Sequence, residues 1–169
     1  MMLPFDSGGG ECAGMFAAAE ELASMAKAEG GKPIYAYLDE RACSAAYVLA
    51  SACDKIMGRR EVMGGSIAAI INMLDKSKML EKAGLEPIII RAKWADRKAR
   101  GSGMEKVDEE TISRLEQIVD EASEQVVEFV AAMRGDRGVT AKSIKDLRGE
   151  VFTGNDLKKF GLIDEIASE

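Results

Sequence analysis

The chain contains no histidine. This absence excludes a Ser-His-Asp triad, a Cys-His pair and any metal site that depends on imidazole ligands. A serine or cysteine nucleophile would need a lysine, a carboxylate or a terminal amine as its base. Covalent catalysis, if this chain performs it, is therefore restricted to a few catalytic pairs.

Cysteine is scarce, with three residues at positions 12, 43 and 53. The odd number and a spacing that fits no zinc pattern predict reduced thiols in a cytoplasmic protein without a metal site. Cys43 is an alternative nucleophile, although a small buried thiol is the commoner role of such a residue. Long apolar runs and a signal peptide are also absent, so we expect no membrane segment.

Basic residues are fewer than acidic ones, 23 against 29, which gives a net charge of -6. This balance argues against a general nucleic-acid binder, which normally carries a basic patch. Hydrophobic residues make up 47% and charged residues 31% of the 169 positions, a globular composition in a chain of single-domain length. We therefore expect one globular domain over residues 1–169 and no nucleic-acid partner.

Strand-like and helix-like hydrophobic patterns alternate along the chain. Strands are predicted at 2–6, 32–39, 55–59 and 86–92, the last as a buried strand because it contains three consecutive isoleucines. Helices are predicted at 11–29, with a stop at Gly30 and Gly31, and at 44–54, 72–84, 108–133 and 140–147. This order predicts an α/β fold with a largely parallel sheet. The first strand lies so close to Met1 that the chain looks shortened at its N-terminus.

A glycine-rich turn at 5–14 fits two kinds of site. Gly8, Gly10 and Ala13 satisfy the pattern G-x-G-x-x-[GA], and Asp39 ends the next strand where a ribose partner would sit, as in dinucleotide binding. The same free backbone amides would also suit an oxyanion hole. A tight turn without a ligand is the third interpretation.

Ser44 stands at the start of the alanine-rich helix predicted at 44–54. A serine there is either an N-cap that bonds its own backbone or a nucleophile. The basic stretch 91–100 is, from its charge pattern alone, a solvated surface loop. A dinucleotide site explains neither Ser44 nor this loop.

Five segments resemble, in the same order, those of signal peptide peptidase A and the related phage prohead proteases. They are DSGGGECAG at 6–14, ACSAAYVLASACDKI at 42–56, GGSIAAI at 64–70, LEKAGLEPIIIRA at 80–92 and RGEVFTGNDLKKFGLIDEI at 148–166. The resemblance covers nearly the whole chain, and the SAAY form favours the phage branch. It implies a Clp-protease/crotonase-like fold of repeated ββα units and a single serine peptidase domain over residues 1–169.

The resemblance also implies roles for individual residues. Ser44 is then the nucleophile, and the backbone amides of Gly9 and Ala45 form the oxyanion hole. Ser66 falls where the family places a hydroxyl beside the base. In the glycine turn, Gly8 replaces the proline of the family pattern, which loosens the turn.

The base of this family is a lysine, in agreement with the absence of histidine. The corresponding loop is two residues longer here, and allowing for that insertion places Lys98 at the catalytic position. Without the insertion the position falls on Asp96, and Lys93 becomes the alternative base. Arg97 and Arg100 lie close to Lys98 in the sequence, and like charges favour a neutral amine. We expect Lys98 to be buried in the closed site.

The implied function is that of a Ser-Lys serine endopeptidase that forms an acyl-enzyme and needs no cofactor or metal. Its substrates would be capsid or scaffold proteins in the phage branch, or signal-peptide remnants in the bacterial one. A homo-oligomer is expected, in the cytoplasm or in a phage prohead. Two alternatives are a crotonase-like acyl-CoA enzyme, which would use a carboxylate, and a catalytically inactive assembly protein.

Overall fold

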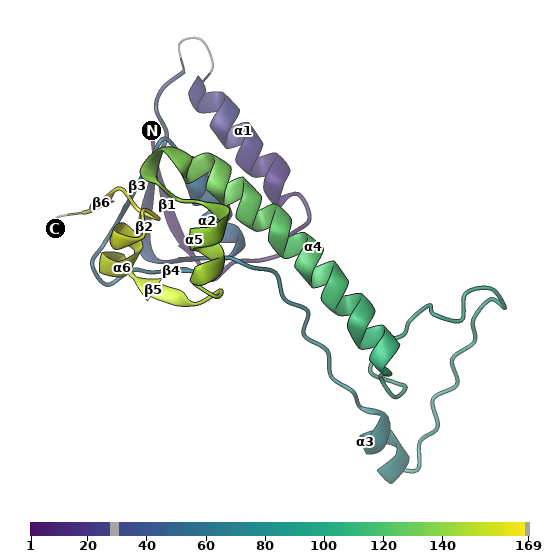
Figure 1. Ribbon diagram of the computed structural model, residues 1–169. Coiled ribbons are helices and arrows are strands. Elements are labelled where there is room, and N and C mark those ends of the chain that lie inside the picture. The colour runs from purple at the N-terminus through teal and green to yellow at the C-terminus, as the bar shows by residue number, and fades with distance from the viewer. Residues whose placement is uncertain (28–30, 168–169) are drawn as a thin grey trace. The chain divides into compact units, whose positions relative to one another are not determined.

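The computed structural model describes residues 1–27 and 31–167 (Figure 1). The strands are β1 (Met2–Ser7), β2 (Tyr35–Cys43), β3 (Lys55–Gly58), β4 (Met63–Gly65), β5 (Val151–Thr153) and β6 (Glu165–Ile166). The helices are α1 (Met15–Lys27), α2 (Ala45–Ser51), α3 (Ser77–Lys82), α4 (Glu109–Arg134), α5 (Ala141–Asp146) and α6 (Gly154–Lys159), with a 3₁₀ turn at Gly135–Arg137. The predicted helix stop at Gly30 lies outside the described residues.

The chain divides into two compact units. The first comprises Met1–Ala69 and Ala122–Glu169 and contains the sheet, α1, α2, α5, α6 and the second half of α4. The second, Ile70–Glu121, contains α3, the basic loop and the first half of α4. Within the described residues, no helix is long and apolar enough to cross a membrane.

The first unit is built on a sheet with the strand order β5-β4-β2-β3-β6, and β1 also pairs with β2. Every pairing except the antiparallel β4–β5 pair is parallel. The predicted largely parallel sheet is therefore confirmed. Pro4 lies in β1, which among the described strands pairs only with β2. A sheet edge is where a residue without an amide donor is tolerated.

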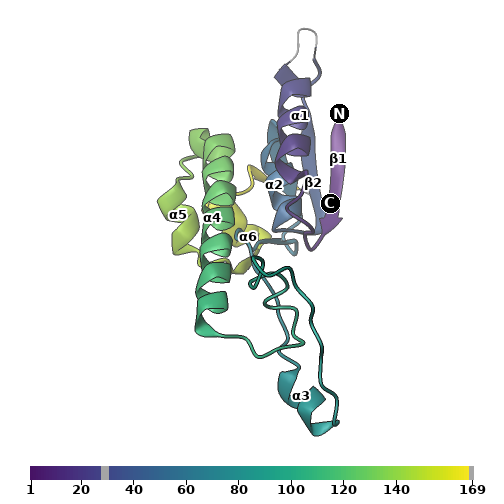
Figure 2. The same cartoon turned by 90° about the vertical axis from the view of Figure 1, so that its right-hand side faces the viewer.

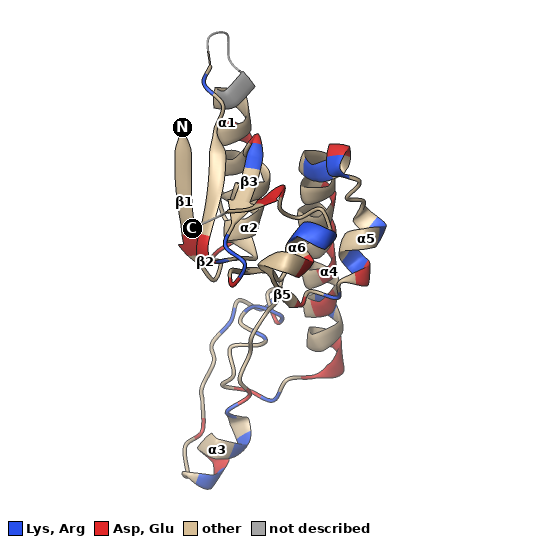
Figure 3. Ribbon diagram, turned by 90° about the vertical axis from the view of Figure 1, so that its left-hand side faces the viewer, with Lys and Arg blue, Asp and Glu red and all other residues tan. Residues whose placement is uncertain are grey.

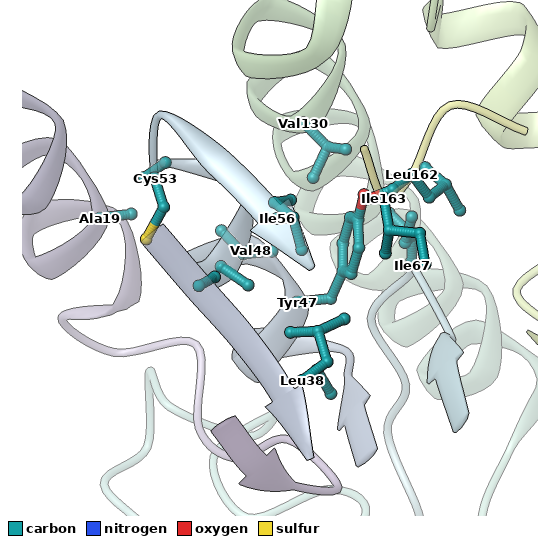
Figure 4. Close-up of a cluster of buried hydrophobic side chains, with 14 of the residues drawn as sticks. Ala19, Leu38, Tyr47, Val48, Cys53, Ile56, Ile67, Val130, Leu162 and Ile163 are labelled. Carbon is teal, nitrogen blue, oxygen red and sulfur yellow. The ribbon is translucent and has the colours of Figure 1, made fainter. Parts of the chain in front are cut away.

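Burial alternates along β2, because Ala36 and Leu38 are buried whereas the tyrosines beside them are half-buried. The buried face packs against α2. Leu38 of β2, Tyr47 of α2 and Val130 of α4 belong to one buried cluster, in which Tyr47 lies between the other two (Figure 4). The hydroxyl of Tyr47 donates a 2.6 Å hydrogen bond to the carbonyl of Leu162. This bond satisfies the one polar atom of a fully buried side chain and fixes α2, which begins just after Ser44.

The second half of α4 packs within the first unit through an aromatic contact and a buried ion pair. The rings of Phe16 in α1 and Phe129 in α4 lie 5.4 Å apart. Figure 2 shows the two helices that carry them. Arg134 is 0% exposed and bonds to the carboxylate of Asp164 at 3.0 Å and to the carbonyl of Gly161. Burial alone would raise the pKa of Asp164, but the hydrogen bonds and charge of Arg134 lower it overall.

In the second unit the predicted buried strand at 86–92 is wrong. The segment has no strand pairing, and the side chains of Ile88 and Ile90 are 85% and 92% exposed. A run of isoleucines favours an extended and buried segment, but a strand also needs a neighbouring strand, and none within the described residues pairs with it. The helix predicted at 72–84 is likewise shortened to Ser77–Lys82.

Candidate active site

The candidate site lies where three strands of the first unit end. Ser7 at the end of β1 pairs with Ala42 of β2, and Cys43 at the end of β2 pairs with Gly65 at the end of β4. The carboxyl ends of parallel strands share one edge of a sheet, which is where such folds build their sites. Gly9, Ser44, Ala45 and Ser66, which follow these strand ends, are therefore brought together.

Ser44 occupies a sharp turn between β2 and α2. Its backbone angles are φ 53° and ψ −126°, a region that residues with a side chain rarely adopt and that costs on the order of 1–3 kcal/mol. The turn is held on both sides, because the amide of Ser44 donates to the carbonyl of Gly65 at 2.9 Å and its carbonyl accepts from Val48 at 3.1 Å. A strained strand-to-helix turn is also how α/β-hydrolase enzymes present a nucleophilic serine.

The side chain of Ser44 makes no capping hydrogen bond, although the residue stands at the N-cap position of α2. Thr140 shows the contrast, since its hydroxyl caps α5 by accepting from the amide of Ser143. The half-exposed Ser44 hydroxyl is thus not used to start its helix. The capping interpretation of Ser44 has no support in this geometry.

Gly9 packs directly against Ser44. A Cβ atom at position 9 would lie 2.8 Å from the Cβ of Ser44 and 3.0 Å from the carbonyl oxygen of Cys43. Gly9 also has φ +112°, which a larger residue adopts only with strain. Added Cβ atoms at Gly8 and Gly10 would meet nothing within 4 Å. Of these three positions, only position 9 needs a glycine because another residue packs closely against it.

Two backbone amides near Ser44 are candidate oxyanion donors. Ala45 is the first residue of α2, and the amides of a first helical turn have no acceptor within their helix. The amide of Gly9 donates to the hydroxyl of Ser7 at 3.2 Å, so a bound oxyanion would have to replace that hydroxyl. Ser7 was absent from the residues predicted for the site, although it is the second residue of the DSGGG motif.

Ser66 follows β4 and is half-exposed, with φ 51°. Its amide donates to the carbonyl of Glu150 at 2.8 Å, which ties it to the segment before β5. A Cβ at Gly65 would lie 2.8 Å from that same carbonyl oxygen, so the glycine permits the approach. The C-terminal RGEVFTG motif therefore positions Ser66.

The candidate bases Lys98 and Lys93 belong to the second unit, and both side chains are exposed. The expected burial of Lys98 is therefore not present in this structure. Arg97 pairs with Glu110, and Arg100 bonds to Glu110 at 3.0 Å. Figure 3 shows basic segments along the ribbon of the basic loop and acidic residues at the start of α4. Both arginines, which were expected to favour a neutral Lys98 through their like charge, are thus paired with carboxylates.

Two alternative interpretations of the site residues lose support. Burial raises the pKa of the Cys43 thiol despite the opposing charge of Arg41, so the thiolate is scarcer than in a free cysteine. Asp39, the candidate ribose partner, forms an ion pair with Arg59 at 2.9 Å. The geometry around β2 accordingly favours Ser44 over Cys43 and does not present Asp39 as a free carboxylate.

The chain is similar to known peptidases along most of its length. It is 31% identical over 168 residues to a protein of Enterococcus faecium that carries the provisional name signal peptide peptidase SppA, covering 98% of this chain and 46% of the relative. It is 25% identical over 168 residues to capsid assembly protease C of Escherichia phage lambda, covering 99% and 36%. The chain spans only 32% to 52% of the length of the curated relatives it matches.

Among solved structures, a peptidase from Plasmodium falciparum superimposes with a TM-score of 0.55 at 13% identity, covering 100% of this chain and 77% of the other. This likeness supports the α/β fold of Clp-protease/crotonase type that the sequence predicted. The sequence profile of peptidase family S49 matches residues 26–169, which include Ser44 and Ser66. The chain belongs to peptidase family S49.

Proposed function

We propose that this chain is a serine endopeptidase that works through a Ser44–Lys98 dyad and an acyl-enzyme. The observation that carries the proposal is the strained turn at Ser44, with Gly9 packed against it at the ends of three parallel strands. Such a turn presents a hydroxyl without a capping role beside backbone amides. Membership of a peptidase family supports the same reaction class.

In the proposed reaction, the Oγ of Ser44 attacks the carbonyl carbon of the scissile peptide bond while its proton passes to the Nζ of Lys98. The amides of Gly9 and Ala45 stabilise the negative oxygen of the tetrahedral intermediate. Lys98 then passes the proton to the departing amine, which leaves an acyl group on Ser44. Water hydrolyses this ester and restores the serine. Ser66 is proposed to support the lysine through its hydroxyl.

Lys98 acts as a base only when its amine is neutral, and removal from water favours that form. Because the side chain is exposed in the structure, we propose that bound polypeptide or a second copy of the chain covers it. Lys93, on the same loop and also exposed, remains the alternative base.

The proposed substrates are polypeptides. The lambda relative is named for capsid assembly and the Enterococcus relative for signal peptides. We therefore propose capsid or scaffold proteins as substrates in a phage prohead or host cytoplasm, with signal-peptide remnants as the second possibility.

The reaction class is tested with an unstructured polypeptide. We expect the purified chain to cleave β-casein into fragments, and the same preparation of Ser44→Ala to leave it intact. Coenzyme A should give no thermal shift, because the proposed site uses a serine and a lysine where an acyl-CoA enzyme would use a carboxylate. Intact casein together with a coenzyme A shift would favour the acyl-CoA alternative.

Gly9→Ala is expected to lower the rate of Ser44 acylation by about 10²–10³-fold, the usual cost of losing one oxyanion donor. The added Cβ would collide with Ser44 and force Gly9 out of its positive φ. Gly10→Ala is the matched control, because its Cβ meets nothing within 4 Å. The two variants are compared by their acylation rates with a fluorophosphonate probe. Equal rates would contradict the role of Gly9 as an oxyanion donor.

We also propose that the chain forms a homo-oligomer through the exposed apolar side chains of the second unit. Large exposed side chains there include Ile70, Leu74, Ile88, Ile90 and Trp94. Exposed large apolar side chains in such number, when they gather in a patch, mark an interaction surface in soluble proteins.

Ile88→Lys/Ile90→Lys is accordingly expected to shift the chain towards monomer in sedimentation velocity, since two buried charges would oppose association. Met25→Lys, at an exposed position of α1 in the first unit, is the control and should leave the distribution unchanged. A wild type that sediments as a monomer at all concentrations would contradict the interface.

A further inference from the structure

One arginine, Arg91, bonds to the backbone of the basic loop at Lys98. The Nε of Arg91 donates to the carbonyl oxygen of Lys98, and its Nη2 donates to the carboxylate of Glu105. The guanidinium group thus links the main-chain carbonyl of Lys98 to the side chain of Glu105 in the same unit. The side chain of Arg91 is only 18% exposed, whereas most basic side chains of the loop are open to solvent.

The turn at Lys98 has little other support of its own. The amide of Lys98 donates to the carbonyl of Ala95 at 3.0 Å, a single local turn bond. The next residue, Ala99, has φ +66°, a left-handed conformation that costs free energy for a residue with a side chain. A strained turn keeps its shape only when its surroundings fix it.

Arg97 and Arg100 make a different kind of contact. Their guanidinium groups form ion pairs with carboxylates at the start of α4 and so link the loop to that helix. Neither group bonds to the backbone of Lys98. Arg91 alone among these three arginines bonds Lys98 itself. Its planar guanidinium group donates to two acceptors at once, and the single ammonium group of a lysine would not reproduce this geometry.

We infer that Arg91 is a positioning residue for the catalytic lysine, with Glu105 holding the guanidinium in place. The inference rests on the proposed function, in which Lys98 is the base that activates Ser44. Arg91 does not touch the reacting atoms. It fixes the carbonyl of Lys98, and thereby the direction in which the Lys98 side chain leaves the backbone.

The test is the rate of fluorophosphonate labelling of Ser44 over a range of probe concentrations, in the full chain. Arg91→Ala is expected to lower the limiting rate by about 10- to 100-fold, the usual effect of a small misplacement of a catalytic group, with unchanged probe affinity. Glu105→Gln should show a smaller loss of the same kind. The double variant should be no slower than Arg91→Ala alone, because both changes break one linked contact.

Arg114→Ala is the matched control, since Arg114 lies in the same unit on α4 and bonds to Gln117. It should label at the wild-type rate. Arg91→Lys keeps the positive charge but loses the two-acceptor geometry of the guanidinium group, so it should recover only part of the wild-type labelling rate. The thermal unfolding midpoint of each variant shows whether the fold is intact.

The outcomes separate this inference from the proposed function. A wild type that carries no label on Ser44 overturns the proposed function itself. A labelled wild type, together with Arg91→Ala labelling at the wild-type rate, overturns the positioning role alone. Equal losses in Arg91→Ala and Arg114→Ala, or strictly additive losses in the double variant, also overturn it.

Discussion

Ser44→Ala is expected to lower the rate of polypeptide cleavage by a factor on the order of 10⁶, the loss found when the nucleophilic serine of a serine protease is removed. The substitution deletes the attacking oxygen and leaves the backbone turn in place. Because alanine bears the same strain as serine at φ 53°, the free energy of unfolding should stay near that of the wild type. The cleavage rate and the urea unfolding midpoint are measured on the same preparation.

Ser24→Ala is the matched control for this prediction. Ser24 lies on α1, where its exposed hydroxyl donates to the carbonyl of Glu21 at 2.8 Å, so its loss should not change cleavage. A Ser44→Ala variant that folds and still cleaves at a rate close to wild type would contradict Ser44 as the nucleophile. Cys43 would then have to be tested, despite its buried thiol.

Lys98→Ala is expected to lower the acylation rate by about 10²–10⁴-fold, the usual contribution of a positioned general base. Lys98→Arg should be about as inactive, because a guanidinium group stays protonated and cannot accept the proton of Ser44. The measurement is the labelling rate of Ser44 as a function of pH, in both variants and in the wild type.

Lys93→Ala is the control that also decides between the two alignments of the basic loop. If the two-residue insertion is placed correctly, Lys93→Ala should label like the wild type. Loss of labelling in Lys93→Ala alone would move the base to position 93 and also remove the premise of the Arg91 inference. Labelling that survives both substitutions would contradict a lysine base altogether.

Much of the first unit could be predicted from the sequence because its elements have regular patterns. The strands β1, β2 and β3 show extended or alternating apolar residues, and α4 has apolar residues at helical spacing over its whole length. The short strand β4 was not predicted, because two of its three residues are glycines that also suit a turn. Its pairing with β2 is long-range and has no local signal.

The segment 86–92 shows the limit of the same reasoning in the second unit. Three isoleucines favour burial, but composition cannot show which surface covers them, and within this chain they remain largely exposed. If the proposed oligomer forms, the partner copy supplies that surface. A single sequence does not contain the geometry of a contact between copies.

At the candidate site, residue types could be predicted but not their geometry. The motifs indicated Ser44, Gly9 and Ser66, and the structure gathers these at one edge of the sheet. The positive φ of Ser44 and the bond from the Gly9 amide to Ser7 arise from tertiary packing, which no local pattern encodes. The contact of Arg91 with the carbonyl of Lys98 likewise depends on how the loop folds back.

Whether Ser44 is an activated nucleophile is decided by labelling the wild-type chain with a fluorophosphonate probe, followed by peptide mapping. Such a probe reacts with a serine only when its hydroxyl is activated, so the modified residue identifies the nucleophile. We expect one label, on Ser44, that is absent from Ser44→Ala and strongly reduced in Lys98→Ala. A folded wild type without any label, or with its label on another serine, would contradict Ser44 as the activated nucleophile.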